Sequence, residues 1–447
     1  MSCEAESRNA TAPEPGVAPP VGGGPAGQDI DPARVAQGLV ERFGPGGGDP
    51  RVADAVPGFD APFFQAGLCG YSDAAMRIVA RRHGCPACVT ESLLDITLLA
   101  GGRGFVKADL GDLADNVPGG DEDTPLIGQI MGCEPRTMAA AAIKMVEQGS
   151  RSPKSYRALA GADGPLATGL GPEGTRRLDT TPIAGDQAPI TSFGAVDVNL
   201  ACPVKKIRKK ARGGHWLAQP DGAIEILEAV RESLPPSVPV TVKMRRGFDD
   251  TPEMAANFER IFDAAYDIGC AWVTVHGRTV EQKYVGPSRW DLLREIVSRA
   301  HERDRAAGRE PRVVFGSGDI WTAADVFRMI AYTGASGASV ARGCIGNPWM
   351  FRQCRDLLAG RNKRQPSLAE QREVLAEHFE LAMAVNARMV RGGDAERAES
   401  FTGRTMRKFG IKFAALHPDA DTVQRAFTQI KSLDDWQDVL EQHYGNA

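Results

Sequence analysis

From about residue 62 to residue 358, short apolar runs alternate with longer amphipathic stretches. Apolar strands that are separated by helices are typical of a parallel sheet that is buried on both faces. We therefore expect helices such as 72–83, 135–148, 251–268 and 322–333 between most of the strands. The pattern predicts strands at residues 62–68, 87–91, 125–131, 195–200, 239–245, 271–277, 312–318 and 337–343.

The number of strand–helix units predicts the fold class. Eight units are what a (β/α)8 TIM barrel requires, and this α/β fold takes about 250 residues. We expect the barrel to span residues 62–358. An open, doubly wound sheet is the alternative, because a count of strands from sequence can be wrong by one.

Three segments depart from this rhythm. Residues 1–61 are rich in Gly and Pro, which predicts a disordered tail with one short helix near Pro32–Phe43. Residues 150–193 form a low-complexity insertion on the connection from a helix to the fourth predicted strand, at 195–200. The βα pattern ends near residue 359, and residues 359–447 read as a smaller, all-α C-terminal domain.

Composition narrows the class of protein. The chain has 447 residues, nine Cys and a formal net charge of −4. It holds no apolar run long enough to span a membrane and no secretory signal, and an odd Cys count does not suggest a disulfide framework. We therefore expect a cytoplasmic protein. The acidic balance argues against bulk coating of nucleic acid, but it is compatible with a local basic patch.

Candidate chemistry gathers where the predicted strands end. In a TIM barrel the active site lies at the C-terminal ends of the strands. One polar residue at such an end is most simply a cap, whereas a series of them favours a site. The residues at these ends are Glu91, Gln129, Met131, Asn199 to Cys202, Lys243, Arg245, His276, Arg278, Ser317 to Asp319, and Ala341 to Gly343.

Two Gly-rich turns, GSGDI (316–320) and ARGCIGNPW (341–349), follow the last two predicted strands. Barrels often bind phosphate at these positions, because backbone N–H groups and a helix N-terminus point at the anion. Arg342 can add a charge-assisted hydrogen bond. The turns thus favour a phosphorylated cofactor or substrate.

Cys202 follows the strand at 195–200, and a basic run comes directly after it. Nearby lysines lower the pKa of a thiol, which favours a functional role for Cys202. From its position alone, Cys202 could equally be a buried thiol without a role in the chemistry. The run is either a solvated loop or a site for a polyanion, and it comprises Lys205, Lys206, Arg208, Lys209, Lys210 and Arg212. Cys85 and Cys88 form a CPAC motif, but no second ligand pair is evident, so we expect no metal site.

Taken in order, these residues resemble the tRNA-dihydrouridine synthase family. The motifs that carry the resemblance are AGLCGYSDAAMR (66–77), TES (90–92), GQIMGCEP (128–135), VDVNLACPVKKIRKKARGG (196–214), TVKMRRGFDD (241–250), VTVHGRTVEQKYVGPSRWD (273–291), GSGDI and ARGCIGNPW. NLACPVKK and the VHGRT motif are specific, since a generic flavin barrel shares the fold but not these stretches.

The resemblance implies an FMN-dependent oxidoreductase, acting on CH–CH groups, that uses NADPH to reduce a uridine of folded tRNA to 5,6-dihydrouridine. Cys202 looks like the catalytic general acid. The implied RNA-binding parts are the basic run and the helical domain, and the implied state is a monomer with no metal or membrane partner. The implied FMN-binding residues are Gly67, Leu68, Cys69, Gln129, Asn199, Lys243, His276, Ser317, Gly318, Asp319, Ala341 and Arg342.

The chain departs from the family pattern at three motifs. Ala66, Gly67 and Leu68 stand for Ala-Pro-Met, Ser317 stands for the Asn of Asn-Gly-Asp, and Ala341 stands for the Gly of Gly-Arg. Backbone contacts survive such changes, whereas a contact of the Asn side chain would be weakened. Two alternatives stay open: a flavin barrel that acts on a free small molecule, and a catalytically silent RNA-binding homologue. The target RNA, tRNA or rRNA, and the uridine position also stay open.

Overall fold

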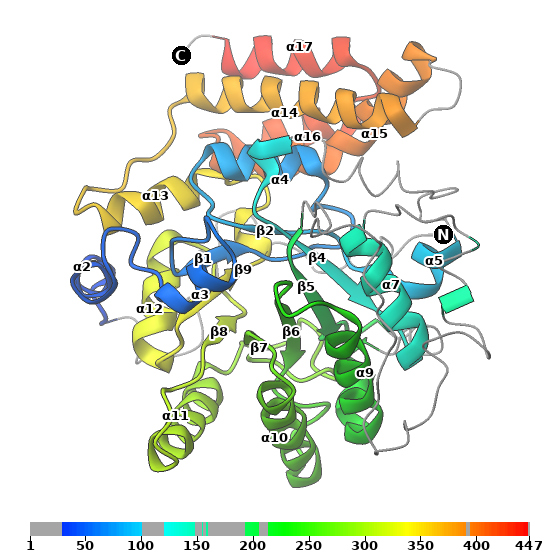
Figure 1. Ribbon diagram of the computed structural model, residues 1–447. Coiled ribbons are helices and arrows are strands. Elements are labelled where there is room, and N and C mark those ends of the chain that lie inside the picture. The colour runs from blue at the N-terminus through cyan, green and yellow to red at the C-terminus, as the bar shows by residue number, and fades with distance from the viewer. Residues whose placement is uncertain are drawn as a thin grey trace.

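The computed structural model describes residues 29–100, 120–147, 154, 158–159, 193–204, 213–389 and 394–445. Within these ranges the central element is a closed ring of parallel strands wrapped by helices (Figure 1). No helix in the described ranges is long and apolar enough to cross a membrane.

Eight strands form the ring, and all eight lie where the sequence predicts them. The ring closes because β2 pairs with both β1 and β4, while β1 pairs with β9. A two-residue strand, β3 (Leu93–Leu94), pairs with the end of β4 as an addition. The TIM barrel is therefore confirmed, and the open sheet is wrong. The ring strands are β1 (Phe63–Gln65), β2 (Cys88–Val89), β4 (Leu126–Met131), β5 (Phe193–Leu200), β6 (Val240–Arg245), β7 (Trp272–His276), β8 (Val314–Ser317) and β9 (Gly337–Val340).

A helix follows each ring strand and covers its outer face. Every helix presents an apolar side to the sheet, and this outer layer makes up most of the hydrophobic core. Figure 1 shows α9, α10 and α11 radiating from the strands that precede them. The helices are α4 (Ala74–Arg82), α5 (Asp95–Ala100), α7 (Pro135–Glu147), α9 (Pro220–Ser233), α10 (Pro252–Asp267), α11 (Trp290–Ala306), α12 (Ala323–Thr333) and α13 (Trp349–Leu358).

The N-terminal segment corrects the expected tail. Residues 29–61 are built into the fold as α2 (Pro32–Phe43), at the position predicted for a short helix, and α3 (Pro50–Ala55), which was not predicted. Asp31 and Asp49 cap the two helices by accepting from the amides of Ala33 and Arg51. The prediction of disorder is wrong for residues 29–61. A few apolar residues are enough to order this segment, because they are buried against the end of the barrel. Residues 1–28 lie outside the described ranges.

Those apolar residues close the N-terminal end of the barrel. Val52, Val56 and Phe59 belong to one buried cluster with Trp272 and Phe315 from inside the ring. The ring of Phe59 lies 5.9 Å from that of Trp272 and 5.8 Å from that of Phe315. Aromatic pairs at such separations are favourable beyond the area they bury. Helix α3 and the segment after it thus form the floor of the barrel.

Four helices follow the barrel: α14 (Leu368–Met389), α15 (Ala395–Phe413), α16 (Ala420–Gln429) and α17 (Leu433–Tyr444). They stack beyond α4, and α14 packs against it (Figure 1). Lys408 donates from Nζ to the carbonyl of Gly70, which follows β1. The helical region therefore borders the C-terminal ends of the strands. Of the expected insertion, Phe193 already belongs to β5, and most of the rest lies outside the described residues.

Candidate active site at the C-terminal ends of the strands

A buried hydrogen-bonded network crosses three neighbouring strands at the barrel mouth. Gln129 of β4 donates from Nε2 to Asp197 of β5 over 2.8 Å and accepts from Asn199 Nδ2 over 2.8 Å. Thr241 of β6 donates its hydroxyl to the second oxygen of Asp197 over 2.6 Å. The parallel register pairs Gln129 with Asp197 and Asp197 with Thr241, so the contacts follow from the strand alignment. The network fixes the orientation of both amides.

Asn199 also fixes the turn that carries Cys202. Its Oδ1 accepts from the backbone amides of Ala201 and Cys202, over 2.9 and 3.1 Å. The carbonyl of Cys202 accepts from Gly214 over 2.9 Å, and Arg245 donates to the carbonyl of Ala201 over 2.9 Å. Cys202 is half-buried and is not in a disulfide. The thiol is thus held by its backbone at the rim of the mouth.

Lys243 stands on β6, beside this network. Its Nζ is buried and finds no hydrogen-bond partner among the described residues. Burial lowers the pKa of Lys243 to about 8, and the nearby Asp197 carboxylate opposes the shift. A small cavity in the barrel is lined in part by Lys243, Gln129, Asp197 and Gly67. A buried amine without a partner at the edge of a cavity is suited to donate a hydrogen bond to a bound ligand.

Gly67 lies where the chain has no room for a side chain. A Cβ at this position would be 2.4 Å from the carbonyl of Thr90 and 3.3 Å from Oε1 of Gln129. Leu68 follows, half-buried, and the amide of Leu68 donates to the hydroxyl of Ser72. Cys69 is exposed. The three residues therefore form one rim of the mouth, with only Gly67 reaching the cavity.

Three arginines and a histidine line the opposite rim. Arg245 and Arg278 are buried, and burial lowers the pKa of Arg245 to about 10. Burial also lowers the pKa of Arg342. Burial, and then the charges of Arg245 and Lys243, hold the pKa of His276 well below its usual value. His276 accepts at Nδ1 from the amide of Arg278 over 3.1 Å, so the neutral ring carries its proton on Nε2.

Asp319 organises this rim. Its carboxylate accepts from Arg278 over 2.8 Å at both oxygens, from the amide of Ser288 over 2.7 Å, and from Arg342 over 3.3 Å. It follows Gly318, whose φ of +109° only glycine adopts readily. The Asp319 side chain is therefore occupied with orienting the two arginines.

The two Gly-rich turns lie together, as the adjacent strands β8 and β9 require. Ser317 is buried and donates to the carbonyl of Ser339 over 3.3 Å. Ala341 and Arg342 begin the next turn. In the described ranges, several buried polar atoms around these turns lack a hydrogen-bond partner: Arg278 Nη1, Ser288 Oγ, Trp321 Nε1 and Ser339 Oγ. Such a set of unpaired donors fits an anion.

The structure thus brings together, at one end of the barrel, every described residue of the predicted FMN and catalytic set. Sequence reasoning missed Asp197, although it lies two residues before Asn199 and therefore on the same face of the strand. The basic residues proposed to bind RNA, from Lys205 to Arg212, lie outside the described residues. Cys85 precedes β2 and Cys88 begins it, and both are buried, with sulfur atoms 3.9 Å apart.

Several known proteins are similar in sequence to this chain. "Probable tRNA-dihydrouridine synthase" of Rickettsia conorii is 28% identical over 316 residues, covering 70% of this chain and 76% of that protein. Its namesake in Treponema pallidum is 36% identical, covering 36% of this chain and 46% of that protein. "tRNA-dihydrouridine synthase B" of Shewanella oneidensis is 34% identical, covering 41% and 53%. The chain thus spans about half the length of the last two relatives.

Among solved structures, histamine dehydrogenase from Rhizobium sp. 4-9 matches with a TM-score of 0.42 and 11% identity, over 72% of this chain and 49% of that chain. This likeness is too weak to support an argument. The family model described as "Dihydrouridine synthase (Dus)" matches residues 186–442, which is more than half of the chain and includes Cys202, Lys243, His276 and both Gly-rich turns. The chain therefore belongs to the dihydrouridine synthase family.

Proposed function

We propose that this protein reduces a uridine of folded RNA, with tRNA as the first candidate, to 5,6-dihydrouridine. The observation that carries the proposal is the placement of Cys202. Asn199 holds the backbone of this thiol, and the same Asn199 side chain is bonded to Gln129 beside the unpartnered amine of Lys243. The side-chain amide of Asn199 therefore links Cys202, the candidate proton donor, to the buried site around Gln129 and Lys243. Membership of the family supports the same reading.

The mouth fits a flavin mononucleotide. The buried amine of Lys243 and the close approach at Gly67 suit a flat ring system that offers hydrogen-bond acceptors. The unpaired donors around the two Gly-rich turns suit a phosphate. When bound, such a group supplies hydride transfer to the substrate, with NADPH as the proposed source.

Each side of the mouth then has a task. Gln129 and Lys243 would contact the ring system, and Asn199, Gly67, Leu68 and Cys69 would line it. His276, with its proton on Nε2, would donate a hydrogen bond. The phosphate and its sugar-alcohol chain would lie against the turns formed by Ser317, Gly318, Asp319, Ala341 and Arg342.

Cys202 acts as the general acid. Its thiol delivers a proton to carbon 5 of the uracil while carbon 6 receives the hydride, and a positioned proton donor contributes typically about 10²–10⁴-fold to a rate. Asn199 is a positioning residue, because it fixes the two amides around the thiol. Arg245, which donates to the carbonyl of Ala201, also interacts electrostatically with Cys202.

RNA would lie across the mouth, against the helical region. Lys408 contacts the loop after β1, and Lys412 lies close enough to Arg342 for their charges to interact. These cations border the mouth, and the basic residues from Lys205 to Arg212 follow Cys202 in the chain. Contacts of this kind neutralise phosphates and make binding fall steeply with salt.

The test is a reaction of the purified protein with unmodified tRNA transcripts and NADPH, read by mass spectrometry of nucleosides. We expect a yellow protein with flavin absorbance and dihydrouridine at one position of the RNA. Reduction of free uracil or orotate without RNA would instead support an enzyme of small molecules. RNA binding with neither flavin nor dihydrouridine would support a silent homologue.

A further inference from the structure

Two adjacent apolar side chains stand exposed at the barrel mouth. Tyr284 is 43% exposed and Val285 is 78% exposed. In the described part of the chain, Ile96 and Phe401 are the other exposed large apolar side chains, and neither adjoins the loop after β7. Exposed apolar groups that cluster at a functional rim commonly mark a contact surface. We call residues 284–285 the apolar tip.

The backbone on each side of the apolar tip is held by a buried arginine. Arg245 donates from Nη1 to the carbonyl of Lys283 over 2.8 Å. Arg278 donates from Nε and Nη2 to the carbonyl of Gly286, over 2.9 and 2.6 Å. The amide of Val285 donates to the carbonyl of Gln282 over 2.8 Å. The backbone of the tip is therefore held in place, while Val285 is largely exposed and Tyr284 partly so.

The same two arginines connect the apolar tip to the site. Arg245 also holds the carbonyl of Ala201, next to Cys202, and Arg278 also binds Asp319. The guanidinium groups of Arg245 and Arg342 lie 5.7 and 5.1 Å from the centre of the Tyr284 ring. Cation–π contacts of this kind orient an aromatic ring. The tip is thus fixed beside the position where the substrate base must enter.

We propose that the apolar tip enters the base stack of the substrate RNA beside the target uridine and keeps that base extruded. This inference rests on the proposed function. A base that reacts inside a protein has to leave its stack, which costs a few kcal/mol, and an apolar side chain that fills the gap offsets part of that cost. Val285 is the wedge, and the ring of Tyr284 is a stacking surface for a neighbouring base.

The experiment compares Val285→Ser, Val285→Ile and wild type on two RNAs. One RNA is the folded tRNA transcript, and the other is a short single strand with the same sequence around the modified uridine. Glu310→Ser, at a side chain that is 83% exposed before β8, at the end of the barrel away from the mouth, is the control. We expect the ratio of rates, folded to single-stranded, to fall about tenfold in Val285→Ser, because one apolar stacking contact is lost. It should hold within twofold in the other two variants.

A second measurement reads base extrusion without the reaction. An RNA hairpin with 2-aminopurine next to a loop uridine becomes more fluorescent when that neighbour loses its stacking. Wild type should raise the fluorescence on binding, and Val285→Ser should raise it much less at saturation.

An unchanged ratio, or an equal increase of fluorescence in both proteins, would overturn the wedge. If wild type formed no dihydrouridine on either RNA, the proposed function would fail, and the fluorescence would still decide whether the apolar tip unstacks RNA.

Discussion

Arginines gather at both ends of the barrel, but in opposite electrostatic settings. At the N-terminal end of β8, Arg312 binds Asp304 and Asp263. At the C-terminal end of the same strand, Arg278 and Arg342 share the carboxylate of Asp319, with Lys243 unpartnered nearby. In the first cluster every carboxylate is paired with an arginine, and we call it the matched cluster. In the second cluster the cations outnumber the carboxylates.

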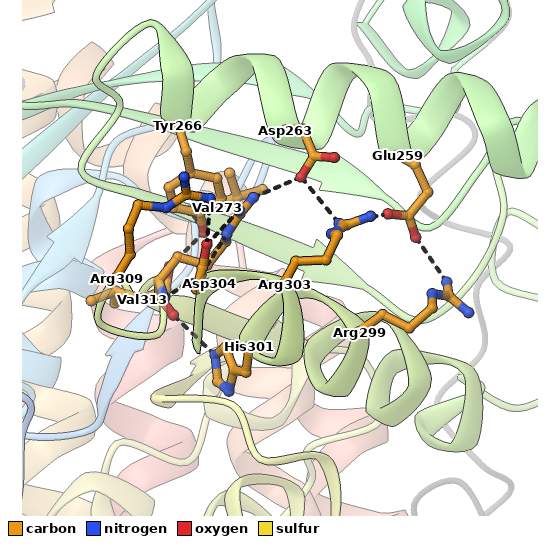
Figure 2. A network of polar contacts seen from close by, with 11 residues as sticks. Glu259, Asp263, Tyr266, Val273, Arg299, His301, Arg303, Asp304, Arg309 and Val313 are labelled. Atoms are coloured by element: carbon orange, nitrogen blue, oxygen red, sulfur yellow. Dashed lines mark hydrogen bonds and ion pairs between the residues drawn. The ribbon is translucent and has the colours of Figure 1, made fainter. Parts of the chain in front are cut away.

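The matched cluster holds helices to strands (Figure 2). Asp304 accepts from the Arg312 amide and guanidinium over 2.8–2.9 Å, and these bonds hold the pKa of Asp304 well below its usual value. Figure 2 also shows Arg303 bridging Asp263 and Glu259. All these carboxylates have charged partners within the network.

The cationic cluster at the mouth is the reverse case. Burial lowers the pKa of Lys243, Arg245 and Arg342, because too few acids surround them to stabilise their charges. In a TIM barrel the mouth carries function and the opposite end carries stability. The contrast teaches that unmatched charge, rather than charge itself, marks the site.

Cys202→Ala gives the largest expected effect, and it is confined to the mouth. We expect dihydrouridine formation to fall by about 10²–10⁴-fold, because the proton donor is lost. Flavin content and the free energy of unfolding should remain those of wild type, which circular dichroism and absorbance would check. A normal rate in the variant would show that another group protonates carbon 5.

Asp304→Asn tests the opposite end. Asp304 is 3% exposed and Arg312 is 10% exposed, so the change removes the more buried of the two carboxylates that pair with this cation and leaves it only Asp263. We expect the free energy of unfolding to fall by about 3 kcal/mol, measured by urea denaturation. Activity per folded molecule should not change.

The matched control is Asp221→Asn, since Asp221 and Arg260 form an exposed pair. This change should cost less than about 1 kcal/mol. Equal losses from the two substitutions would mean that the matched cluster adds no more stability than a surface ion pair.

Lys243→Met sharpens the comparison through pH. The pKa of Lys243 is about 8 in the folded protein against 10.5 for an unperturbed lysine. Between these pH values Lys243 is protonated in the unfolded chain and largely neutral in the folded protein. The free energy of unfolding of the flavin-free wild type therefore rises with pH through this range, relative to that of the variant. We expect a relative rise of about 3 kcal/mol. If the free energies of unfolding of wild type and variant changed in parallel from pH 8 to 10.5, burial of the Lys243 charge would not destabilise the folded protein. Loss of flavin from the variant checks the assigned role separately.

Much of this architecture could be predicted from the sequence. Runs such as 239–245 and 271–277 are apolar enough to be read as buried strands, and strand order then places Asn199, Lys243 and His276 at one end. What could not be predicted depends on distant contacts. The helix α3 is stabilised by Trp272 and Phe315, and no pattern in its own six residues reveals this. The role of Asp319 in holding Arg278 likewise appears only when the two loops meet.

The floor formed by Val52, Val56 and Phe59 sets where the folding unit begins. A protein shortened to residue 62, where the βα pattern starts, would leave Trp272 and Phe315 open to water at the end of the barrel away from the reaction. Such a truncation would be prone to aggregate although every residue of the mouth is present. For this chain, a soluble shortened version has to start ahead of Asp31, the cap of α2.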